Sequence, residues 1–245
     1  MAGSTPNTTL STNDARILNA LFDPETLPSS VAAAKSTSTI DDTLPSHPTI
    51  PSSQLSTLEA HQNDLVRSIT SRSSPSDMEA AIKRQGEIIS SHPSYPSAYL
   101  NRAMLRRMLL ESSSSSSPEG ADASIFTSPD PDLDALFSDL SRAISTCLPS
   151  SAAASSSVST YQARILRTAY SHRAYLYLKA AELGGEWKGK GKSELEEVAS
   201  ADFAGAAKYG DEVAREMSVR TNPYAKMCGA IVRNALREER RDALG

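Results

Sequence analysis

Apolar residues recur at helical spacing in several stretches of this chain, and stretches rich in Ser, Thr and Pro separate them. Residues three and four positions apart lie on one face of an α-helix, so this spacing predicts amphipathic helices. Helices are predicted over 11–23, 51–72 and 160–183, and further helices are predicted to begin near Ser76, Pro96, Pro131, residue 194 and Asn222.

Proline and capping residues mark where the predicted helices begin and end. Ser76 and Glu79 form a capping-box signature, Pro93 ends one helix, and Pro96 begins the next. The layout of 93–103 is typical of a tetratricopeptide repeat, in which paired helices stack with a period of about 34 residues. We therefore predict an all-α fold of three tetratricopeptide helix pairs in a short right-handed solenoid. A C-terminal helix is expected to cap the open end of the stack with an apolar stripe of Cys228, Ile231, Val232, Ala235 and Leu236.

The Ser- and Pro-rich stretches define the expected domain organisation. Residues 1–50 are predicted to be a mostly disordered tail that contains the helix near 11–23. That helix is too short to be stable alone, so we expect it to dock on the helical domain, with docking on a partner as the alternative. The tetratricopeptide domain is expected over 51–241, with low-complexity insertions near 111–129 and 150–159.

Composition narrows the function classes. The net charge of −4 is small and indicates no nucleic-acid partner. Cys147 and Cys228 do not form a metal-binding pair and are expected to be small core residues in a reducing compartment. Because the sequence shows no secretory signal and no run of 18 apolar residues, we expect a cytoplasmic protein with no membrane partner, which could also enter the nucleus.

Catalytic and cofactor motifs find no support in the sequence. The loop Gly184–Ser193 has the glycines and lysines of a phosphate-binding loop, but neither frame fits the required spacing and no strand precedes it. No metal-ligand spacing links the four histidines, which are His47, His61, His92 and His172. We therefore expect a protein that is not an enzyme and that uses no cofactor.

The first helix of each pair is expected to line a binding groove. Alternate turns of these helices would present a mildly basic surface with flexible Met side chains and a Tyr, suited to an acidic, partly apolar peptide or helix. The alternative is that some of these residues only pack against neighbouring helices. The predicted groove residues are Asn63, Arg67, Asn101, Met104, Arg107, Met108, His172, Tyr175 and Lys179.

Two motifs carry a more specific resemblance. One is the short helix that ends in Phe22-Asp23-Pro24, and the other is Asn-Pro-Tyr-Ala-Lys-Met-Cys over 222–228. Together with the repeats between them, they resemble the tetratricopeptide repeat protein 36 family, over roughly 11–26 and 51–241. The resemblance implies a non-enzymatic adaptor that binds heat-shock chaperones of the 70 kDa class and protects an enzyme of tyrosine breakdown.

The sequence departs from the usual chaperone-tail receptor at several positions. Asn101 matches one residue of the clamp that holds a terminal carboxylate, but Thr168 and His172 stand where Lys and Arg are usual. We therefore predict a monomeric adaptor with a non-standard groove, whose partner is a chaperone or a metabolic client enzyme. The alternative is a structural scaffold subunit of a larger complex, bound through its convex face or its terminal helix.

Overall fold

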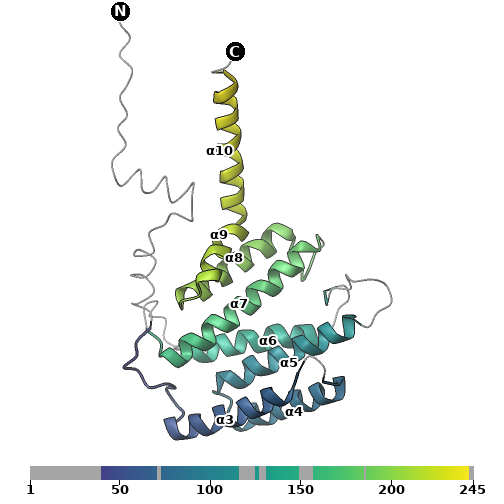
Figure 1. Cartoon of the computed structure of the whole chain (residues 1–245), viewed down its shortest axis with the longest axis vertical. Coiled ribbons are helices and arrows are strands. Elements are labelled where there is room, and N and C mark those ends of the chain that lie inside the picture. The colour runs from purple at the N-terminus through teal and green to yellow at the C-terminus, as the bar shows by residue number, and fades with distance from the viewer. Residues whose placement is uncertain are drawn as a thin grey trace, which may run out of the picture.

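The computed structural model describes residues 40–70, 73–115, 125–126, 131–148, 157–184 and 186–242, and within these ranges the chain is all-helical (Figure 1). The all-α prediction is thus confirmed for the described residues. Their only β-type backbone pairing is two isolated β-bridges. The eight helices are α3 (Ser52–Ser68), α4 (Pro75–Ser91), α5 (Pro96–Ser115), α6 (Pro131–Cys147), α7 (Thr160–Glu182), α8 (Lys192–Lys208), α9 (Glu212–Thr221) and α10 (Pro223–Asp242). The helix predicted over 11–23 lies outside the described residues.

Prolines and capping side chains set most helix starts, as the sequence indicates. Pro96, Pro131 and Pro223 each occupy the first turn, where a missing N–H costs no helical hydrogen bond. At α4 the capping box is not Ser76 with Glu79, as predicted, but Ser74 with Asp77 two residues earlier. Ser74 accepts a hydrogen bond from the Asp77 N–H, and Pro75 follows it at the favoured first position.

Two predicted boundaries are wrong at the C-terminal ends of helices. α3 ends at Ser68 instead of continuing to residue 72, because Ile69 turns into an extended conformation and packs against Leu65 and Ala81. α5 continues to Ser115, so the insertion expected from residue 111 begins later. Residues 116–124, 127–130 and 149–156, which carry most of the predicted insertions, lie outside the described residues.

From α4 to α9, helices that follow one another in the sequence pack as neighbours and form the core (Figure 1). The largest apolar cluster joins α5, α6 and α7, and burial of this surface is the main favourable contribution to folding. Its fully buried side chains include Leu136, Leu140, Leu166, Leu176 and Cys147. A second cluster, built on Phe203, joins α7 and α8 to α9.

The same buried ion pair occurs in two successive helix pairs. Arg102 on α5 makes a two-pronged contact with Asp139 on α6 at 2.8 and 2.6 Å, and Arg173 on α7 does the same with Asp202 on α8 at 2.7 and 2.8 Å. Each Arg follows a Tyr by three residues and precedes an Ala (Tyr99-Leu-Asn-Arg-Ala and Tyr170-Ser-His-Arg-Ala). This internal repeat is the clearest sign that the two pairs are built on one plan.

The segment 40–50, which the sequence analysis assigns to the N-terminal tail, packs against the helices. Ile40 forms a bridge with Val158, and His47 is buried. The His47 Nε2 donates to the Ser94 carbonyl at 2.9 Å, while its Nδ1 accepts from the Ile50 N–H at 3.1 Å. Because both ring nitrogens bond to backbone groups, this segment is fixed to the turn between α4 and α5.

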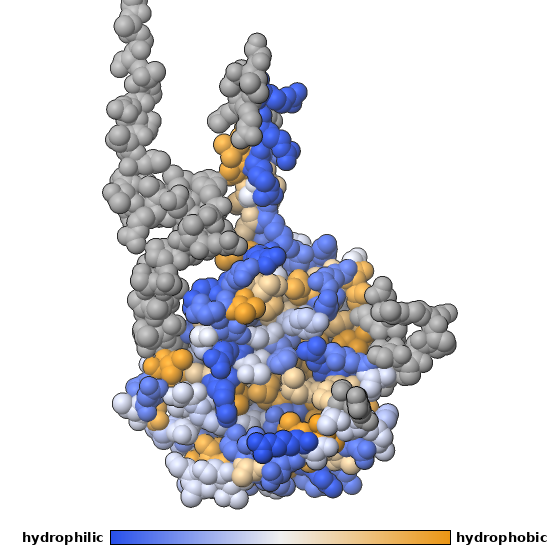
Figure 2. Space-filling model, viewed as in Figure 1, coloured by the Kyte–Doolittle hydropathy of each residue, from blue (hydrophilic) through white to orange (hydrophobic). Residues whose placement is uncertain are grey.

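The C-terminal end differs most from prediction. α9, which was not predicted, packs on α8, and Ser200 donates to the Ser218 carbonyl at 2.6 Å between them. α10 extends away from the body (Figure 1), so it does not cap the stack. Apolar side chains lie along one side of α10 and charged ones along the other (Figure 2), and Cys228 is exposed and not a core residue. The capping role falls to α9 because its Ala214 fills the space beside Phe203.

Removing Asp202 tests the repeated ion pair. The Arg173 side chain is only 18% exposed, so Asp202→Leu should leave its charge buried without a carboxylate and lower the free energy of unfolding by about 3–5 kcal/mol. Urea unfolding followed by the fluorescence of the single Trp187 measures this. The exposed Glu197→Leu on the same helix should change stability by less than about 0.5 kcal/mol. Equal effects of the two variants would contradict the ion pair's role.

Candidate protein-binding site

The first helices of the pairs, α3, α5 and α7, lie side by side and are joined by polar side chains. We call their shared surface the α3–α5–α7 face, and it contains the nine predicted groove residues. At its centre the Arg107 guanidinium stacks over the Tyr175 ring at 4.8 Å and lies 3.3 Å from His172 Nδ1. Glu111, one turn further along α5, accepts from Arg107 Nε at 2.7 Å. Arg107, Glu111, His172 and Tyr175 form what we call the Arg107 cluster.

The protonation of His172 follows from this geometry. A guanidinium can only donate, so the Nδ1 of His172 accepts and the neutral ring carries its proton on Nε2. Burial lowers the pKa of His172, and the Arg107 charge lowers it further. The cluster therefore holds a guanidinium, paired with the Glu111 carboxylate, on an aromatic ring with a neutral histidine beside it.

Other predicted residues are distributed around this cluster. Lys179 lies 5.7 Å from the centre of the Tyr175 ring and forms an ion pair with Glu182 at 2.7 Å. Met104 and Met108 are partly exposed on α5, and Asn63 and Arg67 are exposed on α3. Within the described residues Arg67 forms no ion pair, so its charge is open to solvent.

Asn101 differs from the rest of the predicted set. Its amide donates to Gln62 Oε1 at 2.6 Å, and the same oxygen accepts from Gln85 at 2.9 Å. Gln62 and Gln85 are both buried between the first two helices. Asn101 thus binds the first helix pair to the second, as in the packing alternative that the sequence left open.

A polar network around Glu59 joins the three helices and was not found from the sequence. Glu59 Oε1 accepts from Tyr95 at 2.6 Å, Ser97 at 2.6 Å and Tyr161 at 3.0 Å, and Oε2 accepts from Arg164 at 3.1 Å. No sequence signal marks it, because its members come from α3, the turn before α5, the first turn of α5, and α7. The donors hold the carboxylate ionised where helices from all three pairs meet.

Two opposing effects set the pKa of Glu59. Burial raises this pKa, but the hydrogen bonds from Ser97, Tyr95 and Tyr161 and the charge of Arg164 together outweigh it. The pKa of Glu59 therefore lies below its ordinary value. Burial also raises the pKa of Tyr95 and of Tyr161, so both hydroxyls remain protonated donors.

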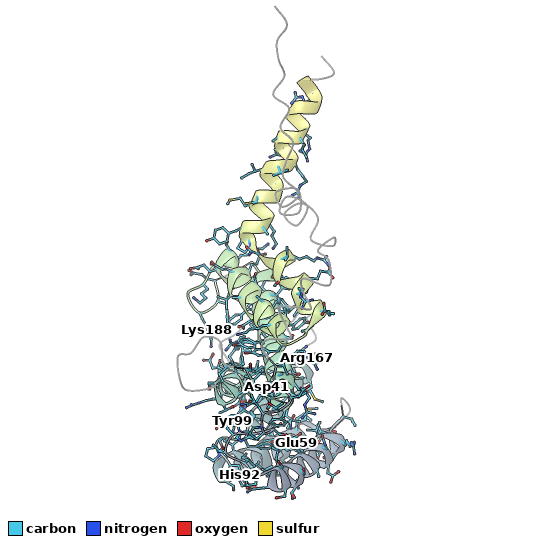
Figure 3. All side chains as sticks on the ribbon, turned by 90° about the vertical axis from the view of Figure 1, so that its left-hand side faces the viewer. Asp41, Glu59, His92, Tyr99, Arg167 and Lys188 are labelled. Carbon is cyan, nitrogen blue, oxygen red and sulfur yellow. The ribbon has the colours of Figure 1, made fainter. Side chains whose placement is uncertain are left out.

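A cavity of about 440 Å³ lies beside this network on α7, and the sequence analysis overlooked it. Its walls include Tyr161, Tyr209, Arg164 and Arg167. Figure 3 shows Glu59 low in the molecule and Arg167 above it. Arg167 is exposed and forms no ion pair with any described residue. The spacing of two Arg on successive turns of α7 was the signal that could have identified it.

No group of three or more His, Cys, Asp or Glu within the described ranges has a geometry that could hold a metal ion. In the same part of the chain, none of the helices combines the length and the apolar character that a membrane span requires. The arrangement offers cations, aromatic rings and hydroxyl groups on a helical surface. Such groups suit non-covalent recognition of an acidic partner.

Comparison with known proteins gives one long match. Neither a family model nor a solved structure matches the chain. The sequence is 43% identical over 247 residues to the L-tyrosine degradation gene cluster protein hmgX of Aspergillus fumigatus, a match that covers 94% of this chain and 93% of the relative. The chain therefore belongs to the hmgX family, and its relative is a protein of a tyrosine degradation gene cluster.

Replacing Glu59 tests the polar network. Glu59→Leu leaves three hydroxyl donors without their shared acceptor and should lower the free energy of unfolding by about 2–4 kcal/mol. Glu59→Gln keeps one acceptor oxygen and should cost less. Urea unfolding measures both, with exposed Asp64→Asn on the same helix as the control. A Glu59→Leu protein as stable as the control would show that the network contributes nothing.

Acid should destabilise the fold through the buried His47 and the half-buried His172. Burial lowers the pKa of His47 and of His172 from the ordinary 6.5, so the folded protein binds fewer protons than the unfolded chain. Their contribution to stability is complete above pH 6.5 and is lost as the pH falls toward the lowered pKa values. Urea unfolding between pH 7.5 and 5.5 should show this decline.

The matched variant is His47→Gln combined with His172→Gln. It should be less stable at pH 7.5, because it loses hydrogen bonds, but its stability should change little between pH 7.5 and 5.5. A variant with the same decline as the wild type would assign the pH dependence to other groups.

Proposed function

We propose that this protein is a non-enzymatic adaptor in tyrosine breakdown that binds a protein partner on the α3–α5–α7 face. The relative hmgX, an L-tyrosine degradation gene cluster protein, supports the pathway, and the Arg107 cluster carries the binding proposal. A cation stacked on an aromatic ring is a preferred contact in protein interfaces, because it is positioned before the partner arrives. Its Arg and Tyr are both held in place by neighbouring side chains.

We further propose that the helix pairs are tetratricopeptide repeats. The repeated Tyr-x-x-Arg-Ala sequence and the ion pairs Arg102–Asp139 and Arg173–Asp202 support a common unit in two pairs. The first pair replaces this ion pair with the hydrogen bond between Gln62 and Gln85. In such stacks each unit contacts its neighbours, which leaves one extended surface for a ligand.

The proposed partner has an acidic, partly apolar segment, carried by a chaperone of the 70 kDa heat-shock class or by a metabolic enzyme of the pathway. Arg67 and Arg167 support the choice of charge, since neither is neutralised by a described residue. Arg107 and Tyr175 would contribute the central contact. The adaptor would act by masking a surface of its partner or by bridging two proteins, and not by catalysing a reaction at this site.

Charge reversal on the α3–α5–α7 face should weaken partner binding. Tagged wild type should retain a 70 kDa chaperone or an enzyme of tyrosine breakdown from cell extract. Arg107→Glu on this face, or Arg167→Glu at the cavity beside the Glu59 network, should reduce this by about tenfold or more, because an interface anchor contributes about 2 kcal/mol or more. Quantitative mass spectrometry of the retained proteins gives the ratio.

Arg84→Glu on α4 is the matched control, because it makes the same charge change at an exposed residue of another helix. Thermal melts should first show that all three variants are folded. Equal retention by Arg107→Glu, Arg167→Glu and Arg84→Glu would overturn binding on this face. A fixed large complex in size-exclusion chromatography that survives both face variants would favour the scaffold alternative.

A further inference from the structure

The apolar side of α10 is uncovered in the described structure. Tyr224 and Ile231 are each 59% exposed, and Met227 and Leu236 are each 55% exposed. They belong to a stripe with helical spacing (Figure 2) that we call the α10 stripe, made of Tyr224, Met227, Cys228, Ile231, Val232, Ala235 and Leu236. A helix with such a stripe normally buries it against another element.

The lower end of α10 is held while its stripe remains open. Asn222 caps the helix by accepting the Tyr224 N–H at 2.9 Å, and Lys226 forms an ion pair with Glu196 of α8 at 2.8 Å. A 20-residue helix has little stability of its own in water unless an apolar face is packed. An occupant of the α10 stripe would therefore stabilise the helix beyond its anchored first turns.

Residues 11–23 of the same chain carry a matching pattern. They lie outside the described residues, and their sequence predicts a short amphipathic helix that requires a docking surface. Both elements have pairs of adjacent apolar residues one turn apart, so two such stripes can interdigitate along nearly parallel axes. The predicted stripe of this N-terminal segment is Ile17, Leu18, Leu21 and Phe22.

The charges of the two elements are opposite. α10 contains five cationic side chains and three carboxylates, a balance of +2. Residues 11–23 contain two carboxylates and one cation, a balance of −1. Two copies of α10 would bring like net charges together, whereas the N-terminal segment brings opposite ones. The charge pattern therefore favours the N-terminal segment over a second α10 as the occupant.

The connection is long enough for docking within one chain. Ile40 and Tyr209 line the same cavity, which places the start of the described chain beside the end of α8. From Tyr209 through the ten residues of α9 to Pro223 the path spans at most about 35 Å. The connecting residues 24–39 can span about 50 Å when extended. The segment before Pro24 can thus reach the α10 stripe.

We propose that residues 11–23 dock as a helix on the α10 stripe of the same chain. This contact buries two apolar faces that are each unstable when exposed to water, and it pairs opposite charges at their borders. It is independent of the proposed function, because neither element contributes a residue to the α3–α5–α7 face.

Disulfide trapping in the full-length chain tests the contact. Cys228 lies on the α10 stripe and is exposed, while burial raises the pKa of the Cys147 thiol to about 12 and keeps it unreactive. Leu18→Cys or Leu21→Cys, oxidised at low protein concentration, should give an intramolecular disulfide with Cys228. It appears as a faster-migrating monomer on a non-reducing gel and disappears when Cys228→Ser is added. Asn19→Cys, on the opposite side of the predicted helix, should give at least fivefold less of this disulfide.

A second measurement uses hydrogen exchange of residues 223–242. Leu21→Asp should raise amide exchange there by at least tenfold relative to wild type, while Asn19→Asp should leave it unchanged. The proposal is overturned if neither Leu18→Cys nor Leu21→Cys gives more disulfide with Cys228 than Asn19→Cys. It is also overturned if Leu21→Asp leaves the amide exchange of α10 unchanged. Disulfide-linked dimers that form in preference to the fast monomer would assign the α10 stripe to a second copy of the chain.

Discussion

The paired contact of an Arg with a buried Asp, in two of the three helix pairs, fixes much of this molecule. Arg102 with Asp139, and Arg173 with Asp202, set the rotation of α5 on α6 and of α7 on α8. Because a helix turns by about 100° per residue, fixing one side chain inward determines which neighbours face outward. Tyr175 follows Arg173 by two residues, and its place beside Arg107 depends on that rotation.

The Glu59 network adds a constraint between pairs. A carboxylate with three hydroxyl donors and an Arg has little conformational freedom, and here its partners come from two other helices and a turn. It joins α3 to α7 across the N-terminal end of α5. Ion pairs within helix pairs and a polar network between them therefore hold the α3–α5–α7 face in one shape, which lowers the entropic cost of binding a partner.

The features that depend on local chemistry, such as helix starts, could be predicted from the sequence. Pro96, Pro131 and Asn222-Pro223 marked helix starts correctly, because proline conformation and capping act within one turn. The helical spacing also grouped Arg107, His172 and Tyr175, which lie together in the structure. The Glu59 network and the cavity beside Arg167 could not be found in this way, since they depend on the distances between helices that are far apart in the sequence. The ordering of 40–50 depends on His47, whose hydrogen-bonding partners include a carbonyl in the turn before α5.

The prediction for the C-terminus failed for a related reason. The apolar stripe of α10 was recognised, but a stripe does not say what it contacts. α9 is short and polar, with Ala214 as its only fully buried apolar side chain, and it therefore gave little periodic signal. Yet this small residue is what fits against Phe203, so α9 and not α10 covers this part of α8. Because the helix pairs close their own end, the apolar side of α10 must be covered by something that the stack does not supply. An amphipathic segment of opposite charge in the same chain meets that requirement without a second molecule.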